Sequence, residues 1–345
     1  MDGKKRKRLS ASATPWDDVT EGELEPSQAI VAASHKGIYA FRHERHVGDA
    51  DFYNGYPRES CPYCGRSVAK AGFNRTGVQR YRCKACKKVS TPVTGTIFDN
   101  AKLPVTAWAD FILQAISFES ISSMTREDRR ADTTPPYWMA KLFTVLDGIQ
   151  DDTVLAGRVW IDEKYWPVAA KDAARRADGR LLRGLSRNQI CIAIGIDESG
   201  RSIFLCEGFG KPNIGRTWAA FGSHIAPRSI LVHDMEHAHT VLVSRLSLID
   251  EQHNAKTLKG LPDDINPLEP VNRLCYMADR FLGSHSGFNR TDLQGYLNLL
   301  HVAMNPPENK LEKVAMVLDR AMRCPNTLRF RDFYNVKPSS KDCDK

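Results

Sequence analysis

The chain has 345 residues, a formal net charge of +8 at pH 7 and 42% hydrophobic residues. This length fits two or three domains rather than one small domain, and the apolar content is sufficient for buried cores. No run approaches the roughly 18 consecutive apolar residues of a membrane-spanning helix, and no export signal opens the chain, so we expect a cytoplasmic protein without a membrane segment.

The N-terminal segment is basic and then polar. Residues 4–8 are all Lys or Arg, and Ser, Thr, Pro and acidic residues follow to about residue 28. Weak apolar periodicity predicts a flexible arm there. An arm that clamps the DNA backbone, a nuclear-localisation signal and a solvated tail all fit this composition. We assign residues 1–57 to this arm and a small structured lead-in.

Four cysteines have the spacing C-x2-C-x18-C-x2-C, namely Cys61, Cys64, Cys83 and Cys86. Two such knuckles can present four thiolates tetrahedrally to one Zn²⁺. Two disulfides are the alternative, but they require an oxidising compartment. We therefore predict a structural Zn²⁺ site and a zinc ribbon over residues 58–100. The other cysteines lack this spacing and are expected to be ordinary thiols: Cys191, Cys206, Cys275, Cys324 and Cys343.

The predicted ribbon is strongly basic. Residues 58–88 contain nine Lys or Arg against one acid, Glu59. A merely solvated face would intersperse both signs, whereas a one-signed stretch favours a polyanion, because each neutralised phosphate releases counterions. We expect double-stranded DNA as the partner.

Three short helices are predicted over residues 101–150. An apolar stripe at helical spacing begins near residue 106, a second short helix is expected at 122–130, and Pro135-Pro136 can open a third. This succession fits a helix-turn-helix that binds DNA, and it fits a plain helical linker equally well.

From residue 158 the pattern changes to strands. Apolar runs predict strands at 159–168, 189–197, 201–206 and 229–233, with a helix at 217–225 before the last strand. Later helices are expected at 271–282, 292–304 and 310–322. Three antiparallel strands, a helix and a further strand are the opening of a ribonuclease-H-like α/β fold, which we assign to residues 155–323, with a tail over 324–345.

Two aspartates lie in or directly after these strands. Asp162 lies inside an apolar strand, where an unpaired carboxylate is costly, and Asp234 follows the run Ile230-Leu-Val. Groups at the carboxyl ends of strands line the ligand crevice of an α/β sheet. A pair of carboxylates suits Mg²⁺ or Mn²⁺, and two such ions can drive phosphodiester cleavage. Either aspartate alone is more simply a turn or cap residue.

The chain resembles the zinc-ribbon DDE-type transposases of bacterial insertion sequences (ISXO-like family) over residues 60–322. The blocks that carry the resemblance, in this order, are Cys61-Pro-x-Cys64 with Cys83-x-x-Cys86, Thr94-Gly-Thr-Ile-Phe98, Ile161-Asp-Glu163, Arg183-Gly-Leu-Ser-Arg-Asn188, His233-Asp234, the run 269–275, and residues 286–298. The resemblance implies a ribonuclease-H-like catalytic domain in which Asp162 and Asp234 are the first two metal-binding acids. It also implies homo-oligomers on DNA.

The third catalytic position implied by this family is an Asn, Glu or His that opens a helix, often with a Lys seven residues later. Asn272 matches the first, while Asp279 stands where the Lys belongs. Positions seven apart share one helix face, so both can point at the metal crevice. Asp279 either restores a third carboxylate or marks an inactive copy. Glu236 and Glu269 are further candidates.

Two other features flank the acids. Residues 171–187 carry six Lys or Arg against two acids and can grip DNA or form a solvated loop. His233, His237 and His239 have spacings seen in Zn²⁺ sites. We expect them instead beside the acids or on a helix face, because a hydrolytic zinc site leaves Asp162 without a role.

Three functions remain open on sequence. The first is a transposase that binds terminal repeats, cleaves a DNA strand and joins it to target DNA. The second is a catalytically decayed DNA-binding regulator, which Asp279 favours. The third is a zinc-ribbon transcription factor, which leaves the strand-rich half of the chain without a purpose.

Overall fold

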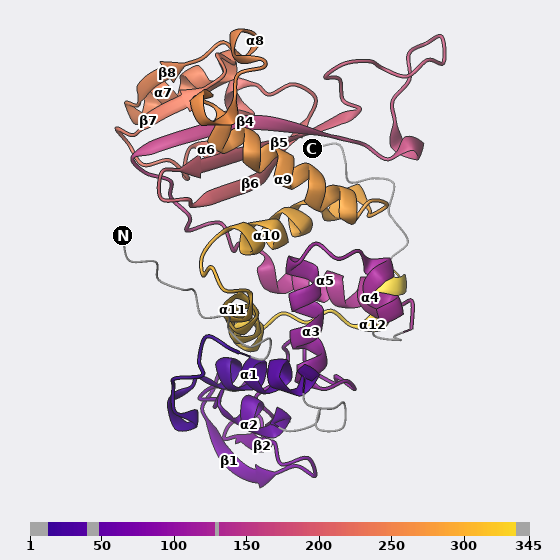
Figure 1. The fold of residues 1–345 in the computed structure, drawn as a ribbon. Helices are drawn as coiled ribbons and strands as arrows, with labels where there is room; N and C mark the ends of the chain where they lie inside the picture. The colour runs from indigo at the N-terminus through magenta and orange to yellow at the C-terminus, as the bar shows by residue number, and fades with distance from the viewer. Residues whose placement is uncertain (1–12, 40–47, 128–130, 336–345) are drawn as a thin grey trace, which may run out of the picture. The chain divides into compact units, whose positions relative to one another are not determined.

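The computed structural model describes residues 13–39, 48–127 and 131–335. The basic stretch 4–8 and Cys343 lie outside these ranges. The chain forms two compact units. Unit 1 comprises Met1–Ser117, Ile121–Val145 and Pro307–Lys345, and unit 2 comprises Phe118–Ser120 and Leu146–Pro306 (Figure 1).

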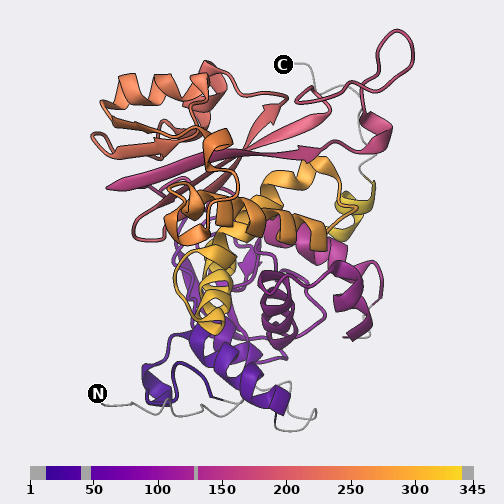
Figure 2. The same ribbon diagram turned by 45° about the horizontal axis from the view of Figure 1, so that its top comes forward.

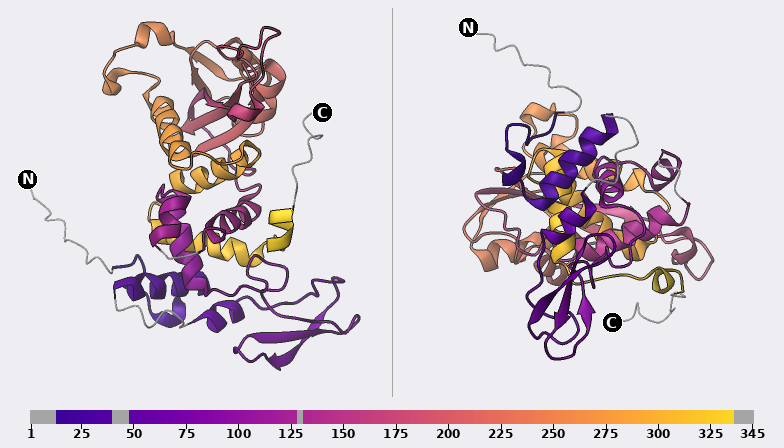
Figure 3. Two further views of the ribbon diagram at one scale, coloured as in Figure 1. Left: turned by 90° about the vertical axis from the view of Figure 1, so that its right-hand side faces the viewer. Right: turned by 90° about the horizontal axis from the view of Figure 1, so that it is seen from below.

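Unit 1 contains a three-stranded antiparallel sheet in the order β1-β2-β3 (Figure 3). The strands are β1 (Val68–Phe73), β2 (Gln79–Cys83) and β3 (Val89–Ser90). Side chains of β2 are alternately buried and exposed, as expected for a strand with one face against the core.

Arg58 is one of the nine basic residues of the ribbon, yet its guanidinium donates to the carbonyls of Thr91 (2.7 Å) and Pro92 (3.1 Å). It therefore holds the ribbon together, and eight exposed basic side chains are left on the surface.

Helices form the rest of unit 1. They are η1 (Glu21–Glu23), α1 (Pro26–Tyr39), α2 (Asp49–Asn54), α3 (Val105–Ile116), α4 (Ile121–Glu127), α5 (Thr134–Leu146), α11 (Lys310–Arg323) and α12 (Phe330–Asn335). The buried rings of Trp108 and Trp138 stack with centroids 4.0 Å apart, which joins α3 to α5. Helix α11 packs against α1 and α3. This helix, expected from sequence in the 155–323 domain, thus lies in unit 1.

Helix α5 is the predicted third helix of the helix-turn-helix. All its residues are buried or half-buried. Its one lysine, Lys141, is buried and donates to the Ile97 carbonyl at 2.6 Å. A recognition helix must present side chains to a DNA groove. The burial of α5 therefore favours the plain packed helix, the alternative that the sequence left open.

Unit 2 is a mixed five-stranded sheet covered by helices, in the order β6-β5-β4-β7-β8. The strands are β4 (Arg158–Pro167), β5 (Gln189–Asp197), β6 (Ser202–Phe209), β7 (Ile230–His233) and β8 (Ile249–Gln252). Strands β4, β5 and β6 are antiparallel, whereas β7 and β8 run parallel to β4. The expected strands are all present, and β8 is additional.

Helices cover both faces of this sheet (Figure 2). They are η2 (Ala170–Asp172), α6 (Ile214–Phe221), η3 (His237–His239), α7 (Thr240–Leu246), α8 (Ala255–Leu258), η4 (Asp263–Ile265), α9 (Glu269–Ser284), η5 (Arg290–Asp292) and α10 (Leu293–Met304). One core joins Val159 and Ile161 of β4 to α6 and α7. On the other face, α9 contacts β4 and β5, and α10 contacts β6. Because side chains alternate along β4, Asp162 faces α9 and Glu163 faces the opposite side.

A buried histidine at the end of α9 gives a first testable prediction. Neither ring nitrogen of His285 has a hydrogen-bond partner among the described residues, and burial lowers the pKa of His285 to about 4. The unfolded chain takes up this proton near pH 6.5, so the stability contributed by neutral His285 is lost as pH falls from 6.5 to 4. Lowering the pH from 7.5 to 4.5 should reduce the free energy of unfolding of both proteins. We expect the reduction to be about 2.5 kcal/mol smaller in His285→Phe than in the wild type. Urea unfolding at both pH values measures this difference, and equal losses contradict it.

Candidate functional site

The candidate site is built on β4 and β7, which pair in parallel. Trp160 and Val232 are the last paired residues of these two strands, and Asp162 and Asp234 each follow two residues later, Asp162 within β4 and Asp234 just past the end of β7. Asp162 Oδ1 accepts a hydrogen bond from the Glu163 amide at 2.8 Å, and Asp234 Oδ1 accepts one from the Glu236 amide at 3.1 Å. Both aspartates are half-buried. Asp162 therefore lies in β4 and Asp234 directly after the neighbouring strand β7, close enough for the charge of Asp234 to act on Asp162.

The charge around Asp162 is uncompensated. Burial, followed by the negative charges of Glu163 and Asp234, raises the pKa of Asp162 to about 6, although His239 opposes this shift. The charge of Asp234 is thus one cause of the raised pKa of Asp162. A bound cation would relieve this repulsion, and carboxylate oxygens are the ligands that Mg²⁺ and Mn²⁺ prefer.

This pKa predicts a pH-dependent instability without Mg²⁺ or Mn²⁺. Folded Asp162 takes up its proton near pH 6 and the unfolded residue near 3.8, so this group destabilises the fold increasingly as pH rises through 6. Asp162→Asn should therefore be more stable than the wild type by up to about 3 kcal/mol at pH 8. The gain should shrink below pH 6. Thermal unfolding from pH 5 to 8 measures it, and a gain independent of pH contradicts this assignment.

Helix α9 carries the candidates for the third position. Asn272 and Asp279 both lie on it, and Cys275 between them on the same face places its Sγ 3.8 Å from Asp162 Oδ2. Burial raises the pKa of Cys275, and the Asp162 charge adds to this effect. Cys275, expected to be an ordinary thiol, thus contacts the site, and no spacing in the sequence indicates it.

Asp279 forms an ion pair with Lys164 of β4, with Oδ2 and Nζ 2.5 Å apart. Lys164 is two residues beyond Asp162 and faces α9 with it. A cationic side chain of β4 thus lies beside the carboxylate at position 279 of α9. The carboxylate of Asp279 is neutralised by this pair. Asn272 is exposed on the first turns of α9.

Glu236 and Glu269, the further candidates for the third catalytic position, lie in different surroundings. Glu236 follows Asp234 by two residues, and its Oε2 lies 3.0 Å from Lys211 Nζ. Glu269 opens α9. Glu236 is therefore paired with a surface lysine, and its backbone amide, rather than its carboxylate, contacts Asp234.

The histidines next to Asp234 separate into two kinds. His237 is exposed, whereas His233 and His239 are buried. His239 Nε2 lies 2.7 Å from Glu163 Oε1, and the Nδ1 atoms of the two buried rings are 2.9 Å apart. The ligand atoms of His233, Asp234 and His239 lie within 4.8 Å of one another. Glu163, which sequence reasoning did not select, completes this cluster from the neighbouring strand.

The four cysteines of the ribbon converge as their spacing predicts. Cys61 Sγ lies 3.7 Å from Cys86 Sγ, and Cys64 Sγ lies 3.5 Å from Cys83 Sγ. A tetrahedral site with Zn–S bonds of about 2.3 Å has S···S separations of about 3.8 Å. The amides of Tyr63 and Cys86 donate to the sulfurs of Cys61 and Cys83, both at 3.4 Å. No disulfide is present among the described cysteines. This cluster could hold a metal ion such as zinc.

The basic loop between β4 and β5 has a defined conformation. Asn188 accepts a hydrogen bond from the Ala174 amide (2.7 Å) and donates to the Ala174 carbonyl (2.9 Å), which closes the base of the loop. The six basic side chains are exposed: Lys171, Arg175, Arg176, Arg180, Arg183 and Arg187.

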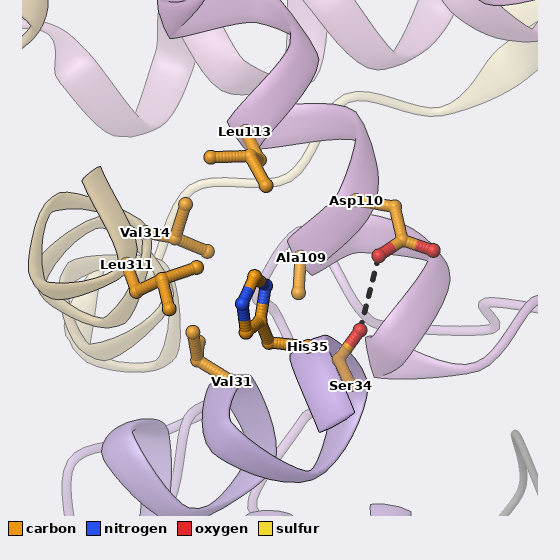
Figure 4. A pocket seen from close by; sticks show the side chains of 8 residues that line it. All are labelled: Val31, Ser34, His35, Ala109, Asp110, Leu113, Leu311 and Val314. Carbon is orange, nitrogen blue, oxygen red and sulfur yellow. Dashed lines mark hydrogen bonds between the residues drawn. The ribbon is translucent and has the colours of Figure 1, made fainter. Parts of the chain in front are cut away.

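A small pocket lies apart from these residues, within unit 1. Helices α1, α3 and α11 line it mainly with apolar side chains, and Ser34 donates to Asp110 at 3.0 Å on its edge (Figure 4).

Across the described ranges, no helix is long and apolar enough to cross a membrane. Neither a scan against protein-family models nor a search of curated proteins gives a match to this chain.

Proposed function

We propose that this chain is a DNA transposase of the zinc-ribbon, DDE type, which binds the terminal repeats of its element and catalyses metal-dependent strand cleavage and strand transfer. The observation that carries the proposal is the placement of Asp162 in β4 and of Asp234 directly after its parallel neighbour β7, where the charge of Asp234 raises the pKa of Asp162. Such a pair is costly unless a cation lies between the carboxylates.

The sheet supports a ribonuclease-H-like fold for unit 2. Three antiparallel strands (β4, β5 and β6) precede two strands that run parallel to β4, and β4 lies at the centre. The central strand and its parallel neighbour carry the two aspartates. This arrangement is what a catalytic domain of the resembled family requires.

In the proposed reaction, Asp162 and Asp234 would hold one or two Mg²⁺ or Mn²⁺ ions, which would activate the attacking water and stabilise the negative charge that develops on the leaving oxygen. Hydrolysis forms a bond from water oxygen to phosphorus and releases the strand with a free 3′-hydroxyl. That hydroxyl then attacks a target phosphodiester, so one P–O bond forms as another breaks and a target 3′-hydroxyl leaves. Lys164 places a positive charge beside these groups, in its pair with Asp279.

Asn272 is our candidate for the third ligand. It lies on α9 three residues before Cys275, and Cys275 contacts Asp162. Asp279 is the weaker candidate, because its carboxylate is already neutralised by Lys164. Glu163 is not a candidate for the third ligand, because it faces away from α9 and its carboxylate contacts His239.

The ribbon and the basic loop are the proposed DNA contacts. The ribbon exposes Arg66, Lys70, Arg75, Arg80, Arg82, Lys84, Lys87 and Lys88. The proposed zinc ion at the four cysteines holds this surface in shape. Binding through such contacts falls steeply with salt, with a slope of about −0.9 in log–log form for each phosphate neutralised.

A labelled duplex that carries the terminal repeat tests the proposal. The wild-type chain should nick it in Mg²⁺ or Mn²⁺ and fail to do so when only Ca²⁺ is supplied. Binding without nicking in every metal would favour the second candidate, a decayed copy that acts as a DNA-binding regulator. Asp279, at the position where the resembled family often has a Lys, favours the decayed regulator. The ammonium of Lys164, which pairs with Asp279, weighs against the decayed regulator because it restores a positive charge there.

A further inference from the structure

Three buried side chains and one exposed carboxylate, Asp250, form a continuous chain of contacts next to the proposed catalytic acids. Glu163 Oε1 lies 2.7 Å from His239 Nε2, the two Nδ1 atoms of His239 and His233 lie 2.9 Å apart, and His233 Nε2 lies 2.9 Å from Asp250 Oδ1. Side-chain exposure is 4% for Glu163, 0% for His239 and 1% for His233. The network is therefore excluded from solvent at Glu163 and the two imidazoles, and it reaches the surface at Asp250, whose side chain is 35% exposed.

Several elements of unit 2 hold the network rigidly. Glu163 comes from β4, His233 ends β7, His239 lies in η3 and Asp250 lies in β8. The three strands are direct neighbours in the sheet, and Asp250 is fixed by the pairing of Leu231 with it. The two rings meet nearly edge to face, with an angle of 81° between them. The two imidazoles are thus oriented by carboxylates on either side.

The number of hydrogen atoms available to bridge the three contacts of this network is unusual. The three contacts need three bridging hydrogens, but two neutral imidazoles carry only two N–H groups. If each Nε2–H donates to its carboxylate, both Nδ1 atoms face each other as lone pairs. Two facing lone pairs repel unless a proton or a metal ion lies between them. Burial lowers the pKa of His239, but the hydrogen bond to Glu163 outweighs it and leaves the pKa raised, so a proton can take this place when no metal is bound and a metal ion would replace it. Metal-binding histidines commonly donate their other ring N–H to a carboxylate, which is the arrangement at Glu163 and Asp250.

We infer that His233 Nδ1, His239 Nδ1 and a carboxylate oxygen of Asp234 bind a divalent transition-metal ion of the Zn²⁺ class, oriented by Glu163 and Asp250. The three ligand atoms already lie within 4.8 Å of one another. Two imidazoles with one carboxylate suit Zn²⁺, whereas Mg²⁺ prefers oxygen ligands alone. Ligand bonds of about 2.1 Å need N···N separations of about 3.4 Å, so the rings must part by about 0.5 Å.

This site adjoins the proposed Mg²⁺ position and differs from it in its two histidine ligands, and it does not depend on the proposed DNA cleavage. Asp234 is shared, since one of its oxygens serves the histidines while its charge reaches Asp162. Three protein ligands leave a fourth position open, as in zinc sites that bind water or a substrate oxygen. The ion would also fix the carboxylate of Asp234 at the end of β7.

Zinc content of the full chain tests the inference. Purified protein, dialysed in Mg²⁺ buffer, should hold one zinc ion at the cysteines and a second at the histidines. His239→Ala should lose one ion, whereas His237→Ala, the exposed neighbour, should lose none. If one ion is bound and Cys86→Ser removes it while His239→Ala does not, the inference is wrong. Loss of a single ion only in His239→Ala supports the histidine site and contradicts the ribbon site.

Two further measurements cover a failure of His239→Ala to fold. Glu163→Gln keeps the side-chain shape and should weaken zinc at the histidines about 10- to 100-fold while leaving the cysteine site unchanged. In wild-type crystals grown with Zn²⁺, an anomalous difference peak at the zinc edge should appear between the two Nδ1 atoms. A peak at the cysteines alone would contradict the inference. Both results are independent of whether the chain cuts DNA.

Discussion

Asp162→Asn is expected to abolish metal-dependent strand cleavage while leaving DNA affinity within about twofold. The substitution removes one of two carboxylates that hold the proposed ions but keeps the size of the side chain. Loss of one group that stabilises charge in a transition state typically costs on the order of 10²–10³-fold in rate, and loss of a metal ligand should cost at least that much. Single-turnover nicking of the terminal-repeat duplex in Mn²⁺ measures the rate.

Asp279→Asn is the matched control for this experiment. The same chemical change is made on α9, at a carboxylate that pairs with Lys164 rather than with a metal. We expect less than a tenfold loss of cleavage. Equal losses in both variants would show that Asp279 belongs to the metal site, and full activity of Asp162→Asn would remove the basis for the proposed mechanism.

Cys83→Ser is expected to unfold the ribbon and to weaken DNA binding by at least about 100-fold, since it removes most of the phosphate contacts. Cys83 is buried at the end of β2, and its Sγ lies 3.5 Å from Cys64 Sγ. A three-stranded sheet this small has little core of its own. Structural zinc contributes about 10–16 kcal/mol in isolated zinc-finger peptides, so we expect the ribbon to depend on an ion bound at the four cysteines.

Hydrogen exchange over residues 58–100 and DNA binding at several salt concentrations measure this effect. Protection of β1 and β2 should be lost, and the salt slope should become shallower by about 0.9 for each phosphate contact that disappears. Cys206→Ser, which changes an exposed thiol of β6, is the control. A protected ribbon with unchanged DNA affinity in Cys83→Ser would contradict a zinc-held DNA-binding surface.

The predicted effects of Asp162→Asn on stability and on DNA cleavage have the same cause. Asp162 destabilises the metal-free fold at neutral pH because it is buried beside like charges. The same repulsion makes it a strong cation ligand. We therefore expect Asp162→Asn to be more stable and less active, a combination that a purely structural aspartate would not produce.

Local patterns in the sequence determined much of the molecule. The cysteine cluster follows from spacing, because a C-x2-C knuckle closes within a few residues. Strands β4, β5, β6 and β7 follow from apolar runs of strand length, and α9, α10 and α11 from helical periodicity. Asp162 and Asp234 stand out because a carboxylate in or directly after an apolar strand is costly.

Partners across elements were decided only by the tertiary structure. Strand β8 was missed because its sequence, Ile-Asp-Glu-Gln, has no apolar run, and it forms by pairing with β7. The contacts of Cys275 with Asp162 and of Lys164 with Asp279 depend on how α9 lies on β4. Glu163 meets His239 because neighbouring residues of a strand face opposite sides of the sheet. Spacing along one segment carries no information about the register or packing of another, so these pairings arise only when the sheet and its helices assemble.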